Sequence, residues 1–132
     1  MNTMANPGQI NDVADALFSA IEHGDGTALA ALWADDIVVW RLGGGRERDK
    51  TRALAVLEWF VAITVERRYE VLDRQFFDGG FVQQHLLHAR GRAGTELRFR
   101  ACLVVRVGDD GLITRIDEYL DPADLTPLAR EL

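Results

Sequence analysis

Residues 111–121, GLITRIDEYLD, have the composition and alternation of a β-strand near the end of the chain. β-Branched and aromatic residues favour strands, and a turn rich in glycine and aspartate precedes this segment. Successive side chains of a strand point to opposite faces, so Ile116, Glu118 and Leu120 share one face. The strand therefore places a single carboxylate on an otherwise apolar surface.

The rest of the chain predicts a helical first half followed by an antiparallel sheet. Apolar residues recur at helical spacing up to Ile63, whereas β-branched and aromatic runs dominate from Arg67 onward. This pattern is typical of an α+β domain with helices on one face of the sheet, in the order ααβαββββ plus a short C-terminal helix. The expected helices are 9–23, 25–34, 49–63 and 125–132, and the expected strands are 37–42, 69–77, 81–90, 96–107 and 112–120.

Composition predicts a single globular domain over residues 1–132, with residues 1–8 disordered. The chain is 48% hydrophobic and 27% charged, as in soluble proteins. Its net charge of −6 gives no electrostatic footprint for nucleic acid. Cys102 is the single cysteine, which excludes an intrachain disulfide and a multi-cysteine metal site. The sequence shows no secretory signal or membrane-length apolar run, so we expect a cytoplasmic protein without a membrane partner.

Three segments carry a resemblance to a known superfamily: ALWADDIVVW (31–40), GFVQQH (80–85) and GLITRIDEYLD (111–121). With the order of elements, they resemble the nuclear transport factor 2-like superfamily, in particular the SnoaL-like polyketide cyclases and limonene epoxide hydrolase. The resemblance spans about 10–128 and implies a cone-shaped barrel. In such a cone, three helices cover the concave face of a curved, mostly antiparallel sheet and enclose a pocket. The superfamily includes isomerases, cyclases, dehydratases and hydrolases, so the fold alone does not give the activity.

Glu118 is the first candidate for catalysis. In the related cyclases and hydrolases, an acidic residue at the matching position acts as acid or base. A carboxylate among apolar side chains prefers its neutral form, which raises its pKa toward the range useful for proton transfer. The alternative is structural: Glu118 pairs with one of the many arginines and holds the sheet together.

His85, His88 and Arg41 are the other candidate catalytic residues. The two histidines are three residues apart, so on a regular strand only one faces the pocket. The resemblance to limonene epoxide hydrolase favours His88 and leaves His85 open. Arg41 shares a face with Val39 and is expected to stabilise negative charge, or else to be a surface residue at a strand end.

The resemblance also argues against two specific mechanisms. Arg41 occupies the place of the catalytic carboxylate of ketosteroid isomerases, and an arginine cannot abstract a proton. Leu103 falls near the place of their oxyanion-hole acid. Of the residues that match the water-positioning set of limonene epoxide hydrolase, only Glu118 preserves the chemical type. Both mechanisms are therefore disfavoured.

The surroundings of Glu118 depend on features that the sequence leaves open. A two-residue turn at 109–110 places Ala101 opposite Glu118, whereas a bulged three-residue turn places Cys102 there. The segment GGGRERDKT (43–51) lacks the Gly-Lys-Ser/Thr of a phosphate loop and is interpreted as a mobile loop at the pocket mouth. The expected apolar wall residues, which are the candidate ligand-binding residues, are Trp33, Val39, Trp59, Phe60, Ile116 and Leu120.

Three functions remain open at this point. The first is an acid/base enzyme for a hydrophobic, oxygen-bearing small molecule. The second is a non-catalytic module that binds a lipid-like or polyketide-like ligand, and the third is a structural dimer with a filled core. No cofactor or metal is implied. We expect a homodimer through the outer sheet face, with Phe77, Ile113 and Tyr119 contributing.

Overall fold

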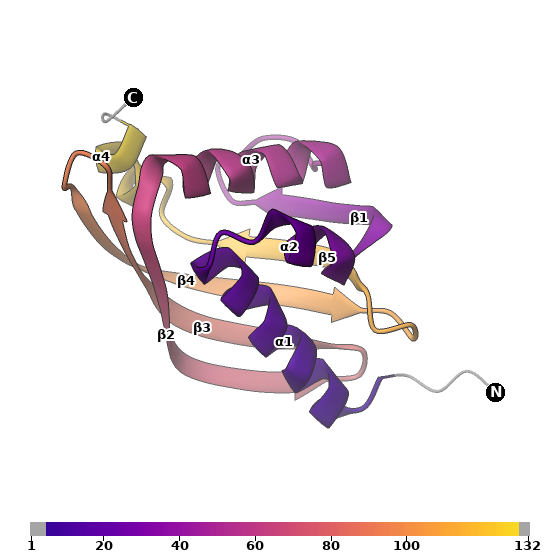
Figure 1. The fold of residues 1–132 in the computed structure, drawn as a ribbon. Helices are drawn as coiled ribbons and strands as arrows, with labels where there is room; N and C mark the ends of the chain where they lie inside the picture. The colour runs from indigo at the N-terminus through magenta and orange to yellow at the C-terminus, as the bar shows by residue number, and fades with distance from the viewer. Residues whose placement is uncertain (1–4, 130–132) are drawn as a thin grey trace.

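The computed structural model describes residues 5–129, which form a five-stranded sheet with its helices on one side (Figure 1). This arrangement and its order along the chain confirm the predicted α+β fold. The strands are β1 (Trp33–Arg41), β2 (Thr64–Phe77), β3 (Gly80–Gly91), β4 (Glu96–Val107) and β5 (Ile113–Tyr119). The helices are α1 (Pro7–Glu22), α2 (Gly26–Leu32), α3 (Lys50–Ile63), the 3₁₀ helix η1 (Pro122–Leu125) and α4 (Thr126–Ala129).

The sheet has the order β1-β5-β4-β3-β2. Neighbouring strands are antiparallel except β1 and β5, which are parallel. Strand β2 curves away from the end of α3 and then runs beside β3 along the far edge of the sheet (Figure 1). This curvature leaves a concave face under the helices, and the final strand, β5, lies between the edge strand β1 and β4.

Side chains at the helix N-termini explain where the three main helices begin. Asn6 and Gln9 form a capping box at α1, each side chain accepting a backbone N–H of the other residue. Asp25 accepts the N–H of Ala28 at α2, and Asp49 accepts that of Arg52 at α3. These caps satisfy donors that have no partner inside the helix.

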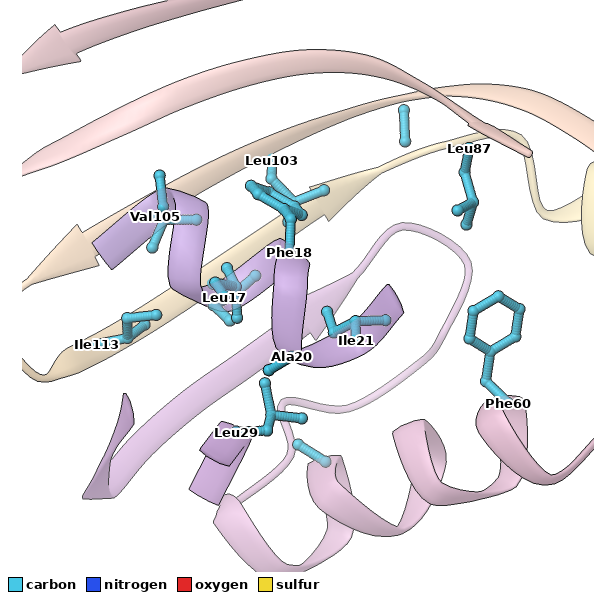
Figure 2. Close-up of a cluster of buried hydrophobic side chains, with 14 of the residues drawn as sticks. Leu17, Phe18, Ala20, Ile21, Leu29, Phe60, Leu87, Leu103, Val105 and Ile113 are labelled. Carbon is cyan, nitrogen blue, oxygen red and sulfur yellow. The ribbon is translucent and has the colours of Figure 1, made fainter. Parts of the chain in front are cut away.

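The core lies between α1 and the inner sheet face. Figure 2 shows Leu17, Phe18 and Ile21 of α1 directed at side chains of the strands, while Leu29 and Phe60 approach from α2 and α3. The inner faces of β3 and β4 are buried in strict alternation, as expected for strands with one covered face. Within residues 5–129, no helix is long and apolar enough to cross a membrane.

Several predicted boundaries are wrong. Strand β2 begins at Thr64 instead of residue 69, and Trp33 begins β1 although the second helix was expected to reach residue 34. Residues 7 and 8 form the start of α1, so the prediction of disorder is wrong for these two residues. Residues 1–4 of the same predicted segment lie outside the described part of the chain. Instead of one helix at 125–132, the chain forms the two short helices η1 and α4. The last part of the expected helix, residues 130–132, lies outside the described residues.

The register of the last hairpin differs from both expected alternatives, because Leu103 lies opposite Glu118. The connection is longer than a two- or three-residue turn. Gly108 N–H donates to Leu112 O at 2.8 Å, Gly111 N–H donates to Gly108 O at 2.9 Å, and a register shift follows Arg106. Relative to the two-residue turn, the pairing moves by two positions, which keeps the same side chains on each face, and relative to the bulged turn it moves by one.

Candidate functional site

A cavity of about 120 Å³ lies between the helices and the concave face of the sheet. Leu17 and Ile21 of α1, Leu87 of β3, and Phe99 and Leu103 of β4 contribute to its apolar lining. Eight residues that the sequence analysis singled out also line it: Trp33, Val39, Arg41, Trp59, Phe60, Ile116, Glu118 and Leu120. The structure thus brings the expected wall and two of the four candidate catalytic residues together around one space.

Glu118 comes from the middle of the sheet, between Arg41 of β1 and Leu103 of β4. Ile116 and Leu120 flank it on the same face and are buried. Burial raises the pKa of the Glu118 carboxyl, and the positive charge of Arg41 opposes this shift only in part. The carboxylate is not involved in an ion pair with any described residue, so the alternative of a structural salt bridge has no support there.

Arg41 lies on the same face as Glu118, one strand away, and lines both the cavity and a hollow that opens to the surface. The hollow shares Val56, Trp59 and Leu125 with the cavity. Arg41 therefore sits where the cavity meets its mouth, instead of being a surface arginine directed away from it.

Tyr69 of β2 is a cavity residue that the sequence analysis missed. Burial, followed by the negative charges of Glu118 and Glu22, raises the pKa of its hydroxyl well above the usual range, so the group remains a proton donor. The alternation of side chains along β2 does not say which of its two faces is turned to the cavity. The pairing of β2 with β3 also has two irregularities, so the face of Tyr69 could not be predicted from the sequence.

The two histidines lie on opposite faces of β3, and His85 is the inward one. His88 lies on the outer face, where its Nε2 is 3.2 Å from Glu70 Oε1, so the prediction that His88 faces the pocket is wrong. The buried alternation of β3 explains this, since Phe81, Gln83 and His85 are all covered by α1 and the core. His85 lies behind the cavity wall, with its ring centroid 4.9 Å from that of Tyr69.

A buried polar network fixes the state of His85. Arg74 Nε donates to Gln83 Oε1 at 2.8 Å, which leaves the Gln83 amide nitrogen to donate to His85 Nδ1 at 2.9 Å. His85 Nδ1 is therefore an acceptor, and the ring is neutral with its proton on Nε2. Burial, aided by the positive charge of Arg74, lowers the pKa of His85 to about 4. Arg74 is held in turn by Asn11 and Asp15 of α1, both at 2.8 Å.

Arg48 is a second missed residue of the cavity. Its backbone forms an isolated antiparallel bridge with Val39, with N···O distances of 2.8 and 3.0 Å. This bridge ties part of the 43–51 segment to β1 and directs the arginine to the cavity. The sequence analysis placed this segment at the pocket mouth but assigned no role to its arginines.

Comparisons with known proteins agree with this geometry. The sequence matches the SnoaL-like domain family over residues 14–116. The chain belongs to the SnoaL-like domain family. The predicted membership of the nuclear transport factor 2-like superfamily is thereby confirmed. Among curated proteins, none matches the sequence.

Solved structures share the fold of this SnoaL-like domain at low sequence identity. A candidate SnoaL-like polyketide cyclase from Shewanella denitrificans OS-217 superposes with a TM-score of 0.81 at 13% identity, covering 96% of this chain and 100% of that one. An LEH-like epoxide hydrolase from M. tuberculosis gives a TM-score of 0.77 at 19% identity, covering 94% and 91%. PrhC from Penicillium brasilianum gives 0.83 at 16%, covering 95% and 88%.

The site of this SnoaL-like domain supports proton transfer at an apolar surface. Its ionisable groups are one carboxyl that resists ionisation, one phenol that keeps its proton and two guanidiniums, and Trp33 and Trp59 add indole N–H donors. Among residues 5–129, no group of three His, Cys, Asp or Glu side chains is placed to hold a metal ion. The chemistry that these groups offer is acid/base catalysis with stabilisation of a developing negative charge.

Proposed function

We propose that this SnoaL-like domain is an acid/base enzyme that acts on a hydrophobic, oxygen-bearing small molecule inside the cavity. The observation that carries the proposal is Glu118, a carboxyl with a raised pKa at the centre of an apolar lining. Because its pKa is raised, the carboxyl stays protonated to higher pH, and in this form it can donate a proton to an oxygen of the ligand. In its ionised form, the same group can accept a proton from a carbon or a hydroxyl of the ligand.

Arg41 and Tyr69 complete this proposal. Arg41 faces the same space as Glu118 and stabilises negative charge that develops on an oxygen of the substrate. Tyr69 donates a hydrogen bond from a hydroxyl that does not ionise. His85 acts indirectly, by packing edge-on against the Tyr69 ring, and is a positioning residue in this scheme.

A non-catalytic binding module is the second candidate, and the composition of the cavity favours it. The lining is mostly apolar, and within the part of the chain that the structure describes Glu118 is its only carboxylate. Native mass spectrometry of the purified protein tests for a co-purified ligand, and incubation of such a ligand with fresh protein separates the candidates. Conversion to a product supports the enzyme, whereas unchanged ligand supports the binding module.

Val56→Trp is expected to block the cavity and weaken ligand binding by about tenfold or more, because the side chain of Val56 lines both the cavity and its mouth. The position is half-buried, so the larger ring fills the mouth without entering the centre of the core. Calorimetric titration with the co-purified ligand measures the change. Arg52→Trp, at an exposed position of the same helix, is the matched control and is expected to bind as the unmodified protein does. Equal affinity in the two variants would place the ligand outside this cavity.

The homodimer through the outer sheet face is also a proposal. Val82, Val104 and Cys102 are half-buried neighbours on this face, and Tyr119, 45% exposed, stacks edge-on with Trp40 beside them. Ile113 is fully buried on the inner side, so its predicted contribution to this face is wrong.

Tyr119→Glu is expected to convert the dimer to a monomer, because it places a charge in the middle of an apolar contact. Sedimentation velocity measures the mass of the particle. Phe76→Glu is the matched control, since Phe76 is similarly exposed but pairs with Phe81 of the inner face. Unmodified protein that sediments as a monomer at all concentrations would contradict the dimer.

A further inference from the structure

Among the described residues, Arg41 and Arg48 are the two arginines that line the cavity. Arg115 lies 2.9 Å from a Glu47 oxygen and 3.0 Å from Asp117, and Arg74 lies 2.8 Å from Asp15. Within residues 5–129, neither Arg41 nor Arg48 has a carboxylate oxygen at ion-pair distance. Both residues are half-buried and line the cavity, so their charges are removed in part from water without a carboxylate at ion-pair distance.

The backbone brings these two side chains to one end of the cavity. Gly44 lies between them: a Cβ at this residue would be 3.3 Å from Arg48 Nη1 and 3.4 Å from Arg41 Cβ. The Gly44 N–H donates to Arg41 O at 2.9 Å, and Arg48 Nη2 donates to Gly44 O at 3.3 Å. With the Val39–Arg48 bridge, these bonds hold the turn that carries both charges. The turn is a defined structure at the mouth, not an open loop.

The charge of the cavity is consequently positive at this end and close to neutral elsewhere. Among residues 5–129, Glu118 is the only carboxylate of the lining, and its burial favours the protonated form. The remaining lining is mostly apolar, including Leu17, Leu87 and Phe99, and its polar atoms are the neutral hydroxyl of Tyr69 and the indole N–H groups of Trp33 and Trp59. A ligand that matches this surface has one anionic end and a hydrocarbon body.

We propose that the cavity binds an amphipathic carboxylate, whose carboxylate end is held at the mouth by Arg41 and Arg48 and whose hydrocarbon chain lies between α1, α3 and the sheet. A guanidinium presents parallel N–H donors that match the two oxygens of a carboxylate, and both arginines here have donors to spare. This inference rests on the proposed function in one respect: both assume that the ligand binds in this cavity. It adds Arg48 as a binding residue and a carboxylic acid as the substrate class.

The test compares ligands that share one chain and differ in the head group. Octanoate, octanol and methyl octanoate are titrated at pH 7.5 into the unmodified protein, and the fluorescence of Trp33 and Trp59, which line the cavity, reports binding. We expect octanoate to bind about tenfold or more tightly than either neutral compound, the range of a hydrogen bond to a charged group. Equal or weaker binding of octanoate would overturn the proposal.

The arginine variants locate the head group. Arg41→Met and Arg48→Met are each expected to remove most of the preference for octanoate while changing the affinity for octanol by less than about threefold, since the thioether keeps the apolar stem. Arg46→Met is the control, because Arg46 is exposed in the same turn and does not line the cavity. Circular dichroism confirms that each variant is folded. Arg41→Lys and Arg48→Lys are expected to keep part of the preference, and they serve as the test if a methionine variant does not fold.

The outcomes separate this inference from the proposed function. Binding of octanol as tightly as octanoate contradicts the carboxylate class but leaves a ligand cavity in place. A preference for octanoate that survives in the double variant Arg41→Met/Arg48→Met puts the anion elsewhere and also overturns the inference. Binding of none of the three compounds overturns this inference, while the proposed function is still tested by the ligand sought with native mass spectrometry. Octanoate selectivity that depends on the arginines, together with no loss of turnover in a Glu118→Gln enzyme, supports this inference and rejects the catalytic role of Glu118.

Discussion

Glu118→Gln is expected to lower kcat by about 100-fold or more while leaving ligand affinity within a few-fold of the unmodified protein. The amide has nearly the shape of the carboxyl but neither donates nor accepts a proton in the reaction, and a positioned general acid or base contributes about 10²–10⁴-fold. Steady-state rates on the substrate identified by mass spectrometry measure the effect. The matched control is Glu70→Gln, an exposed carboxylate on the outer face that is expected to keep the full rate. Full turnover by Glu118→Gln would remove the acid/base role from this residue.

The pH dependence of this reaction follows from the direction of the Glu118 pKa shift. As a general acid, Glu118 is active when protonated, so the rate falls as pH rises through a pKa above the ordinary value for glutamate. As a general base, Glu118 gives the opposite dependence, and the rate rises as pH rises through the same pKa. In Glu118→Gln, this side of the pH–rate profile is expected to be absent in either case. A limb at or below the ordinary glutamate value would contradict the burial that the structure shows.

The same shift gives Glu118→Gln an effect on stability. A carboxyl whose pKa is raised on folding contributes stability below its unfolded pKa of 4.5 and loses that contribution as pH rises through the folded pKa. Above that pH the unmodified protein keeps a buried charge that the variant lacks. Urea unfolding at pH 8 is therefore expected to show Glu118→Gln to be at least as stable as the unmodified protein. Loss of activity with no loss of stability would distinguish a catalytic carboxyl from a structural one.

The second large effect is expected for His85, which should make the domain sensitive to acid. Its pKa is about 4 in the folded protein and 6.5 as the reference value for an unfolded chain. Between these values the unfolded chain binds a proton that the folded protein does not, so stability falls as pH falls from about 6.5 to about 4. The His85 contribution to this loss is about 3 kcal/mol, at 1.36 kcal/mol for each pKa unit. Glu118 acts in the opposite direction over part of this range, so the net loss in the unmodified protein is smaller.

Urea unfolding between pH 7 and pH 4.5 measures this sensitivity. His85→Gln is expected to flatten the dependence of the unfolding free energy on pH, because the amide does not titrate. Some loss of stability at pH 7 is expected as well, since the Gln83 hydrogen bond and the ring contacts with Phe18 and Tyr69 are altered. His88→Gln is the control, because His88 lies on the outer face beside Glu70, and it is expected to keep the slope of the unmodified protein. An unchanged slope in His85→Gln would show that another group carries the acid sensitivity.

The sequence by itself determined the elements and the faces of the strands. Period-two alternation placed Glu118, Ile116 and Leu120 on one face, and that prediction holds although neither expected register of the last hairpin is the observed one, because alternation along one strand does not depend on its pairing. The expected starts of the second and third helices, residues 25 and 49, each lie one residue before the observed starts, Gly26 and Lys50. The positions of the elements and the faces of the strands depend on residues that are close together in the chain, so one sequence is enough to predict them.

Tertiary structure alone decided which groups meet at the cavity. Whether His85 or His88 faces inward depends on which side of β3 the helix α1 covers, and their spacing is compatible with either side. Tyr69 lines the same cavity as Glu118 although β2 and β5 are separated by two strands, and Arg48 is held at the cavity by its bridge to Val39. These contacts join residues far apart in the chain or depend on the length of a turn. Their energies come from packing and hydrogen bonds that no local pattern of residues encodes.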